Sequence, residues 1–196
     1  MVKNLLVIII FISTITFTFA CKQKVKKTES FISIVSIIKK EVADIDTSLY
    51  SIMKVVLIDS LHSDTSFIPR EKFADVAKDF LDIPDLSDPK VAVRYKKEPP
   101  LMEEIINRVI IAYLPVNPEE EEVKRQELLA TPVLGEEARI NNIIILREIN
   151  NRDSFLQKKM LWQVGKSFQV VTTSQKPGKR EITTTTKVIW NEGTNL

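Results

Sequence analysis

The hydrophobic and polar residues between positions 141 and 191 alternate with the two-residue period that is typical of β-strands. The pattern predicts four strands, at Ile143–Ile149, Phe155–Val164, Phe168–Thr173 and Ile182–Trp190. In the second of these, Leu156, Met160 and Trp162 fall on one side, where Lys158 is the charged exception. We therefore expect an antiparallel meander with one buried face.

Short turn sequences separate the predicted strands. Asn150–Asp153 joins the first two, and Gly165-Lys166 suits a two-residue hairpin turn with Gly at the first central position. Pro177-Gly178 is typical of a type II turn. Trp162 and Trp190 both fall on the predicted buried face, so we expect core packing for them rather than stacking on a sugar or a base.

The period changes to that of a helix before this region. Apolar residues recur at spacings of three and four, at Phe31, Ile34, Ile38, Val42, Ile45, Leu49, Ile52 and Val56. No Gly or Pro interrupts the sequence between Thr28 and Phe67. The pattern predicts a long amphipathic helix that covers the sheet, either continuous or broken at Asp46-Thr47-Ser48, where residues that favour helix caps cluster.

Further elements follow this helix. A second helix is predicted between Pro69 and Pro84, and the segment Ser87–Tyr95 fits either a short third helix or a strand. Two more strands are predicted at Arg108–Leu114 and Val123–Thr131.

Together these elements predict a single α+β domain over residues 30–193. Its N-terminal helices, one of them long, would pack on a curved antiparallel sheet of about six strands. In element order alone the chain resembles the cystatin-like and NTF2-like folds, and that resemblance implies a pocket between helix and sheet. No motif in residues 22–196 resembles a family of known activity.

Composition narrows the functional classes. The chain has 196 residues, of which 44% are hydrophobic and 28% charged, as in an ordinary globular domain. The net charge of +2 gives no electrostatic reason to expect binding to nucleic acid. With one Cys and one His, the chain has no intrachain disulfide and no structural zinc site built from these residues.

Residues 1–21 have the layout of a secretory signal. Lys3 is followed by an apolar and hydroxyl run, Leu5–Phe19, and by the small residue Ala20 before Cys21. Thr18-Phe19-Ala20-Cys21 resembles the lipobox of bacterial lipoproteins. The resemblance implies that residues 1–20 are a signal peptide and that Cys21 receives a diacylglyceryl group and becomes the N-terminus.

Two alternatives to a lipoprotein remain for this segment. An uncleaved membrane anchor needs about 20 apolar residues, which is longer than this run. Plain secretion would leave a lone thiol in an oxidising compartment.

Residues 21–29 are predicted to be the lipidated Cys21 and a basic tether. The tether either lies against anionic head groups or is a solvated linker. The residue after Cys21 is Lys22 and not Asp, so the retention signal known from some bacterial lipoproteins is missing. By the same resemblance, we expect the outer membrane rather than the inner membrane.

Two polar segments contain residue types that occur in catalytic or metal-binding sites. His62 lies among Asp59, Ser63 and Asp64, but a catalytic triad is assembled from separate segments, and this run suits a helix terminus. Glu119–Glu122 lacks the alternating ligands and the Gly bend of a calcium loop. We expect it to be a solvated acidic loop.

No other motif indicates catalysis. The sequence has no phosphate-binding Gly loop, no nucleophile elbow and no metalloprotease helix, so we assign no catalytic, cofactor-binding or metal-binding residue. We expect a lipid-anchored, non-enzymatic envelope protein that binds a partner protein, an envelope component or an apolar ligand. The alternative is a periplasmic enzyme that uses carboxylates or tyrosines in a helix–sheet pocket. Buried carboxylates converging in a cavity would favour the enzyme, and an exposed apolar patch would favour binding.

Overall fold

The computed structural model describes residues 31–58 and 62–191. The predicted signal peptide, Cys21 and the basic tether lie outside the described residues, as does Asp59 of the segment around His62.

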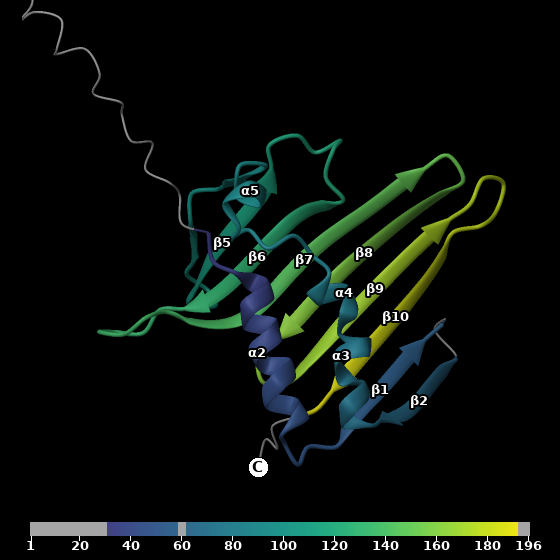
Figure 1. Cartoon of the computed structure of the whole chain (residues 1–196), viewed down its shortest axis with the longest axis horizontal. Coiled ribbons are helices and arrows are strands. Elements are labelled where there is room, and N and C mark those ends of the chain that lie inside the picture. The colour runs from purple at the N-terminus through teal and green to yellow at the C-terminus, as the bar shows by residue number, and fades with distance from the viewer. Residues whose placement is uncertain (1–30, 59–61, 192–196) are drawn as a thin grey trace, which may run out of the picture. The chain divides into compact units, whose positions relative to one another are not determined.

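An antiparallel sheet of ten strands dominates the fold (Figure 1). The strand order is β2-β1-β10-β9-β8-β7-β6-β5-β3, and β4 pairs with β5 outside this path. The strands are β1 (Ile52–Leu57), β2 (Ser63–Ile68), β3 (Tyr95–Lys97), β4 (Leu101–Glu103), β5 (Arg108–Pro115), β6 (Val123–Thr131), β7 (Arg139–Asn151), β8 (Ser154–Gln163), β9 (Ser167–Gln175) and β10 (Ile182–Ile189). The six predicted strands are confirmed as β5 to β10, but the predicted fold class is wrong because four further strands make this mainly a β-sheet protein.

The predicted long N-terminal helix is also wrong. The helix α2 (Ile34–Asp46) has 13 residues and ends at Thr47, whose backbone N–H bonds back to Ile45. The helix ends within Asp46-Thr47-Ser48, where the sequence allowed a break. The chain beyond this point forms the strand β1 instead of a second helix. The sequence of β1 fits both the helical period and the strand period. It forms a strand because it pairs with β10, which lies far along the chain.

The other helices in the described part of the chain are short and lie with α2 on one face of the sheet (Figure 1). They are η2 (Arg70–Lys72), α3 (Phe73–Val76), α4 (Lys78–Leu81) and α5 (Pro89–Ala92). The helix predicted after Pro69 is therefore present as three consecutive pieces. The segment 87–95, for which a helix and a strand were both open, contains α5 and the first residue of β3.

Aromatic side chains form the centre of the core between the helices and this face. Trp162 is fully buried, its ring stacks on Phe168 at 5.2 Å, and Phe80 of α4 meets it edge-on at 5.1 Å. Phe73 meets Trp190 edge-on at 5.2 Å. The expected core packing of both tryptophans is confirmed. We call this side of the sheet the covered face and the other side the open face.

One predicted turn is confirmed and another is altered. Gly178 has φ of 71° and the Lys179 N–H bonds to the Lys176 carbonyl at 3.0 Å, as a type II turn requires. At the β8–β9 turn the Lys166 N–H bonds to the Gln163 carbonyl at 3.0 Å. Gly165, with φ of 74°, is therefore the third residue of that turn and not the first central one.

Candidate functional site

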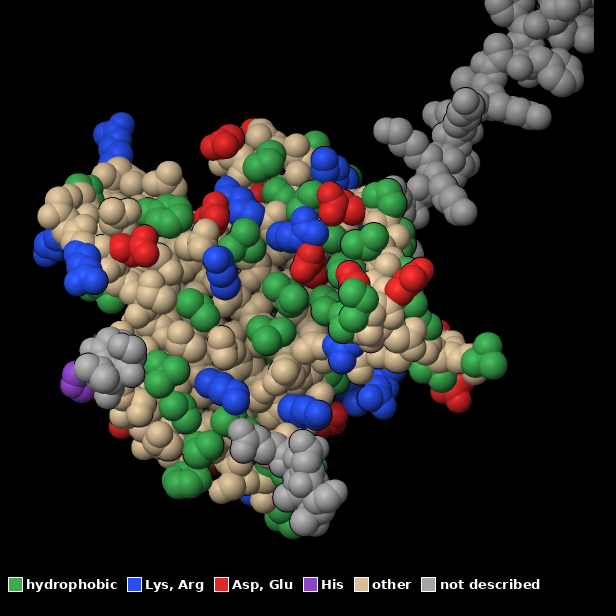
Figure 2. Space-filling view, turned by 180° about the vertical axis from the view of Figure 1, so that it is seen from behind, with side chains coloured by type: hydrophobic (Ala, Val, Ile, Leu, Met, Phe, Trp, Pro, Cys, Tyr) green, Lys and Arg blue, Asp and Glu red, His purple; other side chains and the backbone are tan. Residues whose placement is uncertain are grey.

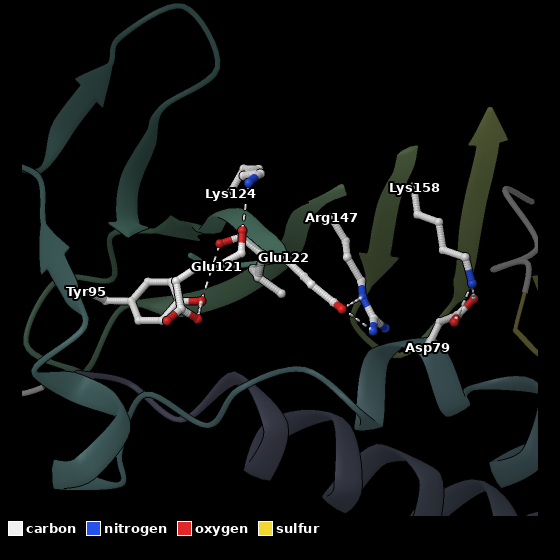
Figure 3. A network of polar contacts seen from close by, with 8 residues as sticks. Asp79, Tyr95, Glu121, Glu122, Lys124, Arg147 and Lys158 are labelled. Carbon is white, nitrogen blue, oxygen red and sulfur yellow. Dashed lines mark hydrogen bonds and ion pairs between the residues drawn. The ribbon is translucent and has the colours of Figure 1, made fainter. Parts of the chain in front are cut away.

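A network of charged side chains borders the helix layer at the β5–β6 connection (Figure 3). Its centre is Glu121, which is only 8% exposed. Arg94 donates a hydrogen bond of 2.5 Å to Oε1 of Glu121, and the hydroxyl of Tyr95 donates one of 3.2 Å to Oε2. The expectation of a solvated acidic loop is therefore wrong for Glu121, because an arginine and a tyrosine compensate its burial.

Lys124, the second residue of β6, holds the loop in place. Nζ of Lys124 donates to the carbonyl of Glu121 at 2.7 Å and also to the carbonyl of Pro118. Burial raises the pKa of Tyr95, and the Glu121 carboxylate raises it further because a phenolate would face a negative charge. Tyr95 therefore stays protonated and acts as a hydrogen-bond donor, which does not suit a general base.

The next glutamate is paired as well. Glu122 accepts two hydrogen bonds from Arg147 of β7, from Nε at 3.0 Å and from Nη2 at 2.6 Å. These residues line a pocket of about 260 Å³, together with the exposed Asp82 and Glu120. In this pocket Glu121 and Glu122 each have an arginine partner. The arrangement therefore resembles a structural network more than an acid–base pair.

His62 has a different position from the one predicted. It directly precedes β2 in the β1–β2 hairpin, and its carbonyl accepts from the Ile58 N–H at 3.1 Å. The prediction that this run ends a helix is therefore wrong. Among residues 31–58 and 62–191, no three His, Cys, Asp or Glu side chains lie close enough together to hold a metal ion.

The open face contains an apolar patch that the sequence reasoning missed. Ile144 lies opposite Leu161, Leu146 lies opposite Lys159, and Lys159 lies opposite Val171. The four apolar side chains are half-buried although no helix among the described residues lies over them, and Lys159 is exposed. In Figure 2, hydrophobic, cationic and acidic side chains are interspersed over this face among uncharged polar groups.

A sequence signal for this patch did exist. Residues 143–146 are Ile, Ile, Ile and Leu, a run without alternation that places apolar side chains on both sides of a strand. Ile143 and Ile145 are fully buried on the covered face, and Ile144 and Leu146 therefore point to the open face.

No protein-family model, curated protein or solved structure matches this chain. Within the part of the chain that the structure describes, no helix is long and apolar enough to cross a membrane.

Proposed function

We propose that this protein is a non-enzymatic, lipid-anchored component of the bacterial envelope that rests the open face of its sheet on an anionic membrane surface. Cys21 is the proposed site of lipidation, and the outer membrane is the favoured location because Lys22 follows it. The apolar patch of the open face is the observation on which the binding role depends.

The composition of the open face supports membrane contact. Ile144, Leu146, Leu161 and Val171 form its apolar centre, and Lys159 lies between two of them. Binding of a protein to a membrane surface strengthens with the apolar area that it buries and with attraction between cations and anionic lipids. The aliphatic side chains and Lys159 meet both requirements, and Glu127, which lies opposite Ile144 on the same face, is paired with Arg125 at 2.5 Å.

The length of the tether supports the membrane as the occupant of this face. Cys21 is separated from Phe31, the first described residue, by about ten residues, which span at most about 35 Å when fully extended. A lipid on Cys21 would therefore keep the domain within about one domain diameter of the head groups. Such tethering makes even a weak surface contact effectively intramolecular.

The charged pocket gives less support to catalysis. Glu121 and Glu122 each form an ion pair with an arginine, and the pKa of Tyr95 is raised further above neutral pH. We therefore favour binding over the enzyme alternative.

Mass spectrometry of the protein from a bacterial membrane fraction tests the anchor. We expect an N-terminal peptide that begins at Cys21 and carries an acyl-glyceryl mass, which the Cys21→Ala variant lacks. A peptide that retains Lys3 would show an uncleaved segment and would contradict the proposal.

A fluorescent label tests the open face. In the lipidated protein Cys21 is blocked, so a Thr173→Cys variant has one free thiol, on the open face beside Gln157. The matched Lys72→Cys variant places the label on η2, where the Lys72 side chain is 65% exposed. In phosphatidylglycerol-containing vesicles we expect an environment-sensitive label to shift to the blue at position 173 and not at 72.

The same pair of labels gives two contradicting outcomes. Equal shifts at positions 173 and 72 would mean non-specific adsorption, and no shift at position 173 would mean that the open face does not touch the membrane. Adding Leu161→Glu to the Thr173→Cys variant should abolish its shift, because a carboxylate would stand in the apolar patch.

A further inference from the structure

A second pocket, which we call the basic pocket, lies where the first residues of β5 and β7 meet the β8–β9 turn. Its volume is about 450 Å³, within the range of small-ligand sites. Its polar lining consists of three cationic side chains and three amides, from Arg108, Arg139, Lys166, Asn141, Asn142 and Gln163. Asn142 and Gln163 are cross-strand neighbours, so the pocket lies at one end of the open face.

The cations of this pocket lack acidic partners. No Asp or Glu lines the pocket, and within the described residues neither Arg108 nor Arg139 nor Lys166 forms an ion pair. Glu103 lies opposite Arg108 in the β4–β5 register, yet these two side chains form no ion pair. This distinguishes the basic pocket from the pocket around Glu121, where both arginines are paired with glutamates.

The amides of the basic pocket are oriented by their neighbours. Oδ1 of Asn142 accepts from Arg108, and Oδ1 of Asn141 accepts from the backbone N–H of Thr131 at 3.0 Å. A guanidinium and a backbone N–H only donate, so in both residues the amide oxygen must face the donor.

In Gln163, Oε1 accepts a hydrogen bond from the Ser167 hydroxyl at 2.7 Å. All three amide oxygens are therefore engaged, and among the described residues their NH₂ groups have no hydrogen-bond partner. These NH₂ groups are unused hydrogen-bond donors of the pocket.

We propose that the basic pocket binds a phosphate group. Three cations attract a multiply charged anion, and the planar guanidinium forks of Arg108 and Arg139 match phosphate oxygens in geometry. The amide donors of Asn142 and Gln163 add neutral hydrogen bonds. The site is formed by residues far apart in sequence, which the sheet register brings together at β5, β7 and β8. This inference goes beyond the proposed membrane contact and does not depend on lipidation of Cys21.

Calorimetric titration of the full chain in a non-ionic detergent with inorganic phosphate and pyrophosphate tests the site. Arg139→Gln and Lys166→Gln remove exposed cations. We expect each to raise the dissociation constant about tenfold, as loss of a charge-assisted hydrogen bond does. The matched controls are Lys179→Gln and Arg180→Gln, exposed cations of the β9–β10 turn, which should bind phosphate as the parent does.

Thermal unfolding supplies an independent measurement. Pyrophosphate should raise the midpoint of the parent and of the control variants, because a ligand of the native state stabilises it, but not that of an Arg139→Gln/Lys166→Gln double variant. No saturable heat at millimolar anion, or unchanged binding in the double variant, would overturn the proposal. An equal loss in Arg180→Gln would overturn it too, because it would indicate general charge screening.

Two soluble probes distinguish the sources of the phosphate group. Glycerol 1-phosphate represents a free phosphate ester, and monomeric dihexanoyl phosphatidic acid adds acyl chains that reach the apolar patch. Tighter binding of the phosphatidic acid identifies a lipid head group as the ligand, and equal binding identifies a soluble ester. If neither binds, the proposal is wrong. Binding of either one without a label shift at position 173 would contradict only the membrane proposal.

Discussion

Lys158 of β8 reaches across the helix–sheet interface to Asp79 of α4, with Nζ at 2.6 and 2.7 Å from the two carboxylate oxygens (Figure 3). Lys158 is the charged exception on the apolar side of β8. The structure explains the exception, because a carboxylate on the covering helix meets the lysine there. The two side chains are 20% and 35% exposed, so the pair is partly shielded from water.

Removing one partner of this pair should destabilise the fold. We expect Lys158→Ala to lower the free energy of unfolding by about 1–2 kcal/mol, because Asp79 is left half-buried without a partner. Lys159→Ala on the opposite side of the same strand is the matched control and should change it by less than about 0.5 kcal/mol. Urea unfolding of the variants measures both values, and equal effects would contradict the interpretation.

Glu41 of α2 should be the most important polar residue of that helix. Its Oε2 accepts hydrogen bonds from Nε1 of Trp162 at 2.8 Å and from the Gly165 N–H at 3.0 Å. Glu41→Leu leaves the indole N–H without a partner, and we expect a loss of about 1–3 kcal/mol in the free energy of unfolding.

The chain offers two comparisons for this variant. Glu41→Gln keeps an accepting oxygen and should cost less than Glu41→Leu. Asp44→Ala breaks the exposed pair with Lys40 and should change stability much less than Glu41→Leu does, because water screens this pair. A loss for Asp44→Ala as large as that for Glu41→Leu would mean that the helix and not the Trp162 contact is responsible.

Replacing a buried phenylalanine and an exposed one by Ala should change the free energy of unfolding by amounts that differ by several kcal/mol. Phe80 is fully buried against Trp162 and Phe168, and Phe67 of β2 is 72% exposed. We expect Phe80→Ala to cost about 3–5 kcal/mol and Phe67→Ala less than about 1 kcal/mol. The midpoints of chemical unfolding give the comparison, and similar losses would contradict the assigned core.

Asp85 should make stability depend on pH in the acidic range. Burial by itself would raise the pKa of Asp85, but hydrogen bonds from Ser87 and Ser33 and the charge of Lys39 together lower it below its usual value. A carboxyl group with a lowered pKa in the folded state stabilises the protein above its unfolded pKa, and this contribution disappears as the pH falls through the folded pKa.

The stability difference between the parent and Asp85→Asn should therefore be largest at neutral pH and shrink below about pH 4. Unfolding curves recorded across this range measure the difference. A difference that does not change with pH would show that the hydrogen bonds, and not the charge, determine the effect of the substitution.

Local patterns in the sequence determined a large part of this protein. Alternation located the strands β5 to β10 and the burial of Trp162 and Trp190, and Pro177-Gly178 located a type II turn. The spacing of apolar residues located α2, which is the first half of the predicted long helix. These features depend on residues within a few positions of one another, so periodicity and turn chemistry suffice to predict them.

Only the tertiary structure decided the rest. The segment Ile52–Leu57 is a strand because β10 pairs with it, and Glu121 is buried because Arg94 and Tyr95 meet it from another part of the chain. The basic pocket likewise depends on strand register, which brings Arg108 and Arg139 to the same end of the sheet. Contacts between residues far apart in the chain leave no local period in the sequence, and for that reason its pattern alone did not predict them.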